Sequence, residues 1–478
     1  MRKILLIVLL LIVGVNLFAQ TILLSEKEEL NLRNDDFMVV GKCRGYSVVY
    51  RNHASIGELL FYNKNMVKEK ISTLSFLPSK LSKIKFTNTS QDMLVFYVVK
   101  ENKSMNVYMS KLNQDYSWTE PQLFESTPME SFRNNGEFNF SVSDDNTKTL
   151  VYNSFSEEGS TKLHAKVVDI NLQVDIEIKQ LMTEGDLYML DVAGVSNRGE
   201  AYLLANDTKA NKGSGEKLIL LTASKGDLNF SFNQFDLNQY SIRDIHLAID
   251  NINRNLYIAS YFSDGRYSKS RGLFLGSYNI ENKIVNPSHF TPITMQVAAT
   301  PTDLKDMKIR NLFLKKSGEV EIVAERTYQN TRSIASITPM LSSSMMMSNM
   351  NENARIVNEF SYDEIAVFNL KSDGSLAWSQ TILKDQTTMD DNGIFSSYGV
   401  LQHRLGNAYI FNDMSGKQSR VLASYISGTG ELTVKELQTS EEIENWNLMP
   451  RSALQMSKSE IVMPCVSKNY LCFLKISY

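Results

Sequence analysis

One structural unit recurs along the whole chain, and this repetition constrains the fold more than any other feature. A hydrophobic strand runs into a tight polar turn, a second strand ends at a tyrosine or a similar residue, and a third strand follows a polar loop; clear copies are 138–152, 245–258 and 311–323. Such a unit has an apolar face that it cannot bury alone, so neighbouring copies must stack.

The turns between the first and second strands divide the chain into eight units. They fall near Arg44, Ser90, Asp145, Arg198, Ile252, Ser317, Leu405 and Lys458, at spacings of 46 to 88 residues. Units of this size are typical of four-stranded propeller blades with outer loops of variable length. We therefore predict an all-β protein, a β-propeller of eight four-stranded blades, with seven blades or an open solenoid as alternatives.

The two ends of the chain are expected to close the ring. The last unit stops at its third strand, 470–477, and needs a fourth. Thr21–Leu30 is otherwise without a unit of its own. Pairing it with the last unit would join the N- and C-terminal strands and leave no open sheet edge at the junction.

The first residues have the layout of a secretory signal peptide. Arg2 and Lys3 precede an apolar run that ends near Val13, and the small residue Ala19 follows. The run is shorter than the roughly 20 residues that a membrane-spanning helix needs. We predict a signal peptide over 1–19 that is cleaved after Ala19, with an uncleaved N-terminal anchor as the alternative.

The remaining chain, 20–478, is expected to be a single propeller domain without a transmembrane segment. Its first cysteine is Cys43, too far along the chain for a lipid anchor. The net charge is −3, and the Lys and Arg residues are scattered, which is not the pattern of a nucleic-acid surface. The expected location is the periplasm, with the cell surface and the extracellular space as alternatives.

Two of the three cysteines are expected to face each other across a hairpin. If Lys468 and Asn469 form a two-residue turn, the register places Cys465 opposite Cys472. A disulfide bond and a pair of free thiols are both compatible with this register, because a bridge needs a specific geometry. The remaining Cys43 is expected to be buried.

One unit carries an insertion rich in methionine and serine at about 330–358. Its methionines are Met340, Met345, Met346, Met347 and Met350. Flexible thioethers provide an adaptable contact surface, so a partner contact or a lid is one interpretation. A neutral insertion and a Cu(I) site are the alternatives.

The remaining motifs do not indicate a catalytic, cofactor or metal site. The acidic turns 34–36, 144–146 and 390–393 lack the spacing of a calcium loop, and their side chains are expected to cap local backbone groups. Gly213–Lys217 lacks the full phosphate-loop spacing, and the five histidines lie far apart. No Ser-His-Asp pattern or paired carboxylates stand out.

Two parts of the chain resemble known propeller families. The stretch 106–124, followed by 141–154, resembles the TolB-type propeller repeat of exported bacterial proteins, with Asp145 and Asn146 where that repeat has Asp-Gly. The stretches 364–379 and 391–398 resemble secreted propeller-like proteins of the Bacteroidetes. Both resemblances imply a propeller fold and export, and neither implies an activity.

These observations lead to an expected function class. The expectation is an exported, non-catalytic binding or scaffold protein of the cell envelope, with a protein or a glycan as its partner. The alternative is a carbohydrate-active enzyme or a glycan-binding propeller, because a propeller can gather loops from many blades around one pocket. A copper-handling protein is a third hypothesis.

Overall fold

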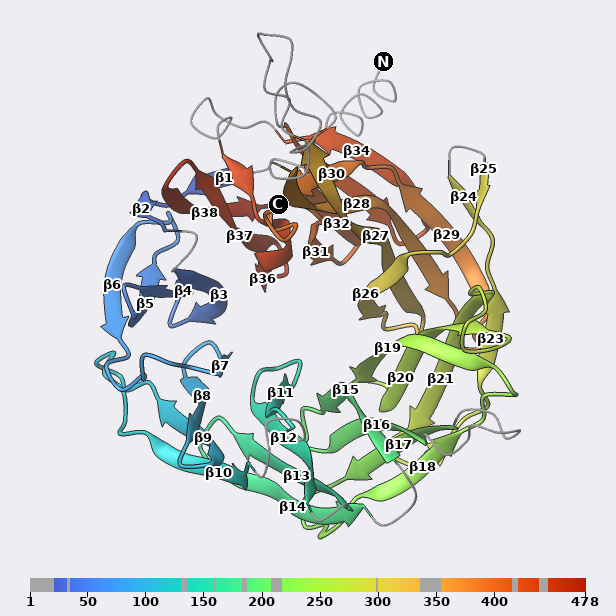
Figure 1. Cartoon of the computed structure of the whole chain (residues 1–478), viewed down its shortest axis with the longest axis horizontal. Coiled ribbons are helices and arrows are strands. Elements are labelled where there is room, and N and C mark those ends of the chain that lie inside the picture. The colour runs from blue at the N-terminus through green and yellow to red at the C-terminus, as the bar shows by residue number, and fades with distance from the viewer. Residues whose placement is uncertain are drawn as a thin grey trace, which may run out of the picture.

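The structure, a computed structural model, is a ring of antiparallel sheets (Figure 1). It describes residues 21–31, 35–129, 136–157, 160–182, 187–207, 217–297, 300–335, 354–414, 420–437 and 446–478. Eight sheets of four or more strands surround the ring axis. The chain is an eight-bladed β-propeller, as the repeat predicted.

Each blade has an inner, a second, a third and an outer strand, which follow one another from the ring axis outward (Figure 1). The first three blades are β3 (Asp36–Cys43), β4 (Tyr46–His53), β5 (Ile56–Tyr62) and β6 (Lys68–Thr73); β7 (Lys83–Asn88), β8 (Met93–Glu101), β9 (Ser104–Lys111) and β10 (Gln122–Pro128); and β11 (Asn139–Val142), β12 (Lys148–Glu157), β13 (Ser160–Asp169) and β14 (Val174–Met182).

Blades four and five are β15 (Leu187–Val195), β16 (Ala201–Asp207), β17 (Lys217–Ala223) and β18 (Ser231–Phe235); and β19 (Ser241–Asp250), β20 (Asn255–Ser263) and β21 (Gly272–Asn279) with the short outer strands β22 (Ile284–Val285) and β23 (His289–Pro292). A hairpin of β24 (Met295–Val297) and β25 (Thr300–Thr302) follows.

Blades six and seven are β26 (Met307–Leu314), β27 (Val320–Ala335), β28 (Ala354–Leu370), β29 (Leu376–Ile382) and β30 (Gln386–Met389); and β31 (Gly399–His403), β32 (Gly406–Asp413), β33 (Arg420–Ser427) and β34 (Leu432–Glu436). β27 and β28 are 16 and 17 residues long. They extend beyond their blade as a paired stem.

The eighth blade is completed by the N-terminal segment, as predicted. Its own strands are β35 (Asn447–Leu448), β36 (Leu454–Ser457), β37 (Glu460–Ser467) and β38 (Tyr470–Ser477), with the short 3₁₀ helix η1 (Pro450–Ser452) between β35 and β36. β1 (Thr21–Leu24) and β2 (Glu28–Glu29) both pair with β38 on its outer edge. The chain therefore closes its ring with strands from both ends.

Hydrogen bonds and ion pairs hold this junction to the last blade and to the first blade. The backbone N–H of Ser25 donates to the carbonyl oxygen of Phe473 at 3.0 Å, and the Ser25 Oγ accepts from the Phe473 N–H at 2.9 Å. Glu28 forms ion pairs with Arg51 at 2.9 Å and with Lys68, both in the first blade. The N-terminal segment thus binds the last blade and the first blade at once.

All eight predicted turns join an inner strand to the second strand of its blade. Because strands alternate in direction, these turns and those between third and outer strands lie on one face of the ring, the turn face. The turns between second and third strands and the linkers between blades lie on the other, the linker face. In the first turn, Arg44 and Gly45 have φ angles of 51° and 82°, which a tight hairpin requires.

The hydrophobic core lies between neighbouring blades rather than in one central mass. Leu150 and Val167 of the third blade share a buried cluster with Leu203 of the fourth. The junction repeats this pattern, since Tyr62 of the first blade packs with Phe473 of the eighth. Each sheet buries its apolar face against the next sheet, so the closed ring buries the apolar face of every repeat. The described part of the chain contains no helix with the length and apolarity of a membrane span.

Candidate functional site

The cysteine register is confirmed. Lys468, at a φ of 55°, lies in a two-residue turn, and Cys465 is directly opposite Cys472. Both are free, buried thiols in the structure, and so is Cys43. A disulfide between Cys465 and Cys472 stays a prediction.

The methionine-rich insertion is mounted on the stem of β27 and β28. Pairing in the stem continues to Ala335 and Ala354. Met340, Met345, Met346, Met347 and Met350 lie outside the described residues, as does the predicted signal peptide 1–19. The partner-contact interpretation of these methionines therefore stays a prediction.

The acidic turns use their side chains for local caps, as expected. Asp145 accepts from the Thr147 N–H at 3.1 Å, and Asp391 accepts from the Gly393 N–H at 2.8 Å. Among histidines, His53 pairs with Asp35 at 2.9 Å. No group of three or more acidic, His or Cys side chains in the described part of the chain could hold a metal ion. Most of Gly213–Lys217 lies outside the described residues, and Lys217 begins β17.

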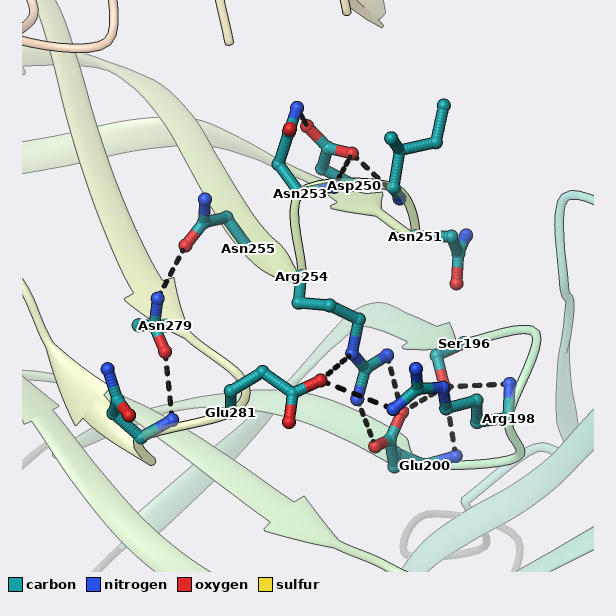
Figure 2. Close-up of polar contacts among 12 residues, drawn as sticks. Ser196, Arg198, Glu200, Asp250, Asn251, Asn253, Arg254, Asn255, Asn279 and Glu281 are labelled. Carbon is teal, nitrogen blue, oxygen red and sulfur yellow. Dashed lines mark hydrogen bonds and ion pairs between the residues drawn. The ribbon is translucent and has the colours of Figure 1, made fainter.

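On the turn face, the turns of blades four and five are joined by polar side chains (Figure 2). Arg254, between β19 and β20, forms ion pairs with Glu200 of the fourth blade and, at 2.8 Å, with Glu281. The pKa of Arg254 is raised, mainly by its hydrogen bonds to Glu200. Arg198 also forms an ion pair with Glu281 at 3.2 Å. These contacts link blades four and five, so the charges of this cluster are paired within the propeller.

A second charged cluster lies beneath the linker face in the sixth blade. The fully buried carboxylate of Glu325 contacts Arg310 at 3.2 Å and Lys384 at 2.9 Å, and it accepts from the Ser397 hydroxyl at 2.7 Å. Burial lowers the pKa of Lys384, and the adjacent Glu325 opposes that effect. The members of this cluster pair with one another. We therefore assign it a structural role, which is to connect blades six and seven.

The linker face also contains a cavity between blades one and two, with a volume of about 400 Å³. It is lined by Asp36, Phe37, Met38, Tyr50, Asn52, Ser55, Gly57 and residues 77–84. Burial, together with the charge of Asp36, raises the pKa of Tyr50 to about 12, so its hydroxyl stays protonated at neutral pH. Asp36 is the one carboxylate among these lining residues.

A second linker-face cavity, which we name the blade 5–6 cavity, has a volume of about 300 Å³. It is lined by Arg243 of β19, residues 267–270 of the turn between β20 and β21, and residues 303–305 of the linker into β26. Three cations (Arg243, Lys269 and Lys305) and one carboxylate (Asp303) contribute to its lining. The ring of Tyr267 is 96% exposed beside them.

Residues outside the blade 5–6 cavity hold its walls in place. Arg326 of β27 donates to the backbone oxygens of Asp303, at 3.1 Å, and of Lys305, and its Nε pairs with Glu364 at 2.6 Å. On the opposite wall, β19 has a bulge directly after Arg243, and the guanidinium carbon of Arg243 lies 6.0 Å from the centre of the Tyr261 ring. Bulges of this kind redirect side chains at functional rims.

The charge state of Asp303 follows from its neighbours. Its Oδ1 accepts from the backbone N–H of Lys305 at 3.0 Å, and its Oδ2 pairs with Lys269 at 3.3 Å. The Lys305 N–H lowers the pKa of Asp303 and outweighs the opposing effect of burial. The carboxylate is therefore an ionised acceptor at neutral pH.

The lining of these two cavities differs from the usual active site of a glycoside hydrolase. Such sites usually have two carboxyl groups about 5 to 9.5 Å apart. The blade 1–2 cavity and the blade 5–6 cavity are each lined by a single carboxylate. What they offer is donors, an acceptor and aromatic surface.

Sequence reasoning did not identify the blade 5–6 cavity. Arg243, Tyr267 and Asp303 lie 24 to 60 residues apart and share no spacing motif. A local signal exists in the connection between β20 and β21, which has eight residues where the corresponding turn of the first blade has two.

Comparisons with known proteins give remote structural similarities. No protein-family model and no curated protein matches the sequence. The fold is similar to prolyl oligopeptidase B from Galerina marginata, with 10% identity and a TM-score of 0.45 over 91% of this chain and 56% of that one. Dihydro-heme d1 dehydrogenase matches at 12% identity and a TM-score of 0.40, over 95% and 76% of the two chains. An α-L-arabinanase of Penicillium chrysogenum matches at 7% and 0.35, over 72% and 97%.

Proposed function

We propose that this chain is an exported, non-catalytic binding or scaffold protein of the cell envelope that holds its partner on the linker face of the propeller. The observation that carries this proposal is the difference between the two faces. On the turn face, clusters such as Arg254 with Glu200 and Glu281 pair internally. The linker face holds the blade 1–2 and blade 5–6 cavities.

Export and the envelope location rest on the N-terminal sequence. Arg2 and Lys3, the apolar run and Ala19 have the order of a signal peptide. In an oxidising compartment, stability without a disulfide framework is in keeping with the extensive packing between blades.

The test blocks one face at a time. The buried native cysteines allow single surface cysteines to be labelled selectively. Ser55→Cys and Ser268→Cys each place a thiol on the linker face, and Ser90→Cys places one on the turn face. Each variant of the mature chain is coupled to a maleimide polyethylene glycol and used to capture partners from envelope extract of the native organism.

The proposal expects that labelling at Ser55→Cys or Ser268→Cys abolishes capture and that labelling at Ser90→Cys does not. Equal loss in all three labelled variants, or loss at Ser90→Cys alone, contradicts it. Unlabelled variants control for the substitutions themselves.

The second candidate function is glycan binding, with carbohydrate cleavage as its enzymatic form. The observation that favours it is the exposed Tyr267 ring beside the polar groups of the blade 5–6 cavity. Release of new reducing ends from a polysaccharide panel, lost on Asp303→Asn, would establish an enzyme. Binding without any new reducing ends would establish a glycan-binding propeller.

A further inference from the structure

We propose that the blade 5–6 cavity binds an acidic sugar residue, a uronate of an anionic glycan. This inference rests on the proposed function, because it names the chemistry of a ligand on the linker face. A uronate offers a carboxylate, several hydroxyl groups and an apolar C–H face. The cavity presents a complement to each of these three features.

The cations of the cavity complement the carboxylate. Arg243 is exposed and has no carboxylate partner among the described residues. A guanidinium is planar and can donate two parallel hydrogen bonds to one carboxylate. Lys269 pairs with Asp303 at 3.3 Å and Lys305 lies 4.0 Å from Asp306, but their side chains are 83% and 72% exposed. Each ammonium group therefore has donor positions left for a ligand carboxylate.

Asp303 complements the hydroxyl groups. Its side chain is 42% exposed, and it retains acceptor positions beyond its contacts with Lys305 and Lys269. An acidic peptide would supply carboxylates to the cations, as a uronate would, but it would offer few hydroxyl donors to Asp303. The acceptor Asp303 beside the three cations therefore favours a sugar acid over an acidic peptide.

Tyr267 complements the C–H face of the sugar ring. Tyr267 is 96% exposed, so it has almost no support from the protein, although it lies at the edge of the cavity. An aromatic ring in this position offers a flat apolar surface next to charged groups. A pyranose ring could stack on it while its carboxylate reaches Arg243.

One wall of the cavity is also preorganised for binding. Arg326 fixes the backbone of Asp303 and Lys305, and it is itself paired with Glu364. A wall that does not need to be ordered on binding saves part of the entropy cost of association. Arg326 is therefore a positioning residue for the cavity.

The experiment measures binding of matched oligosaccharides to the full mature chain by calorimetry at low ionic strength. The probes are an oligogalacturonide, a glucuronate oligosaccharide and the methyl ester of the oligogalacturonide, which keeps the skeleton and removes the charge. We expect at least one acidic probe to bind, and the methyl ester to bind tenfold or more weakly than the oligogalacturonide if that is the probe bound. Loss of a charged hydrogen bond of about 1.5 kcal/mol corresponds to about tenfold in affinity.

Variants locate the interaction. Arg243→Gln should weaken binding about tenfold, and Tyr267→Ala should weaken it severalfold, whereas Tyr267→Phe keeps the ring and the affinity. Arg404→Gln removes the same charge from an exposed residue between β31 and β32, on the turn face, and should leave binding unchanged. Thermal unfolding confirms that each variant is folded.

Several results would overturn the inference. Binding of neither acidic probe, equal binding of the oligogalacturonide and its methyl ester, or equal weakening by Arg404→Gln and Arg243→Gln each contradicts it. A pentaglutamate peptide that binds as tightly as the acidic sugar assigns the cavity to acidic peptides instead. If the acidic probes fail while labelling at Ser55→Cys or Ser268→Cys still blocks capture, the proposed function stands and only the ligand class is wrong.

Discussion

The seam between blades two and three contains a carboxylate whose contribution to stability should depend strongly on pH. Glu125 of β10 is 6% exposed and lies 3.1 Å from Lys166, 3.3 Å from Lys179 and 3.8 Å from His164, all in the third blade. Burial opposes ionisation, but the neighbouring His164 and Lys166 side chains together outweigh it and lower the pKa of Glu125 from 4.5 to about 2.

The size of the effect follows from this shift. A folded-state pKa below the unfolded value stabilises the protein fully above the unfolded pKa, and this contribution is lost as the pH falls through the folded pKa. A change from 4.5 to about 2 corresponds to about 3 kcal/mol of stability at pH 7. About 2 kcal/mol of that should already be lost at pH 3.

Glu125→Gln tests this reasoning, because the amide keeps the shape and cannot ionise. Urea unfolding, followed by the fluorescence of the three tryptophans, gives the stability of each protein between pH 7 and pH 3. We expect the difference between parent and variant to fall from about 3 kcal/mol at pH 7 to about 1 kcal/mol at pH 3. Other acids titrate in both proteins and cancel.

The matched control is Glu177→Gln. Glu177 also contacts Lys166, at 3.2 Å, but its side chain is 50% exposed. Water screens such a pair, so the substitution should cost less than about 1 kcal/mol, with little change over the same pH range. A stability difference for Glu125→Gln that does not vary with pH, or one no larger than that for Glu177→Gln, would refute the reasoning.

Three further outcomes are expected. Glu325→Gln leaves Lys384 buried without its counter-charge and should lower the unfolding free energy by about 3–5 kcal/mol, whereas the double change to Glu325→Leu and Lys384→Met should recover most of that loss in urea unfolding. Deletion of residues 21–29 exposes the outer edge of β38 and should convert a monodisperse protein into higher oligomers in light scattering. The three cysteines are buried, and burial raises their pKa values, to about 11 at Cys43 and about 12 at Cys472, so they should react with a thiol reagent only at the rate of unfolding.

The blade count and the ring closure could be predicted because they depend on local chemistry. Tight turns need residues that adopt positive φ angles or cap themselves, and Asp145, Arg44 and Lys468 mark such turns in the sequence. The residues on each side of such a turn form strands, in which side chains alternate with a period of two. The cysteine register follows in the same way, from one two-residue turn.

The blade 5–6 cavity could not be predicted, because its residues meet only after the ring has formed. Arg243, Tyr267 and Asp303 belong to an inner strand, a turn and a linker, and each alone has the features of an ordinary surface residue. The same holds for Glu125, whose partners belong to the next blade. Contacts between blades depend on the distance and twist between sheets, which no local pattern specifies.

The pairing of β1 with β38 also determines when the last blade can form during synthesis and during any export. Phe473 contacts Ser25 across 448 positions of the chain, so β1 is synthesised long before its partner strand β38. At about 5–20 residues per second, synthesis of the intervening chain takes roughly 20 to 90 seconds. Until β38 is present, β1 and β2 lack their pairing strand, so a protein delivered across a membrane would complete its eighth blade only after β38 has arrived.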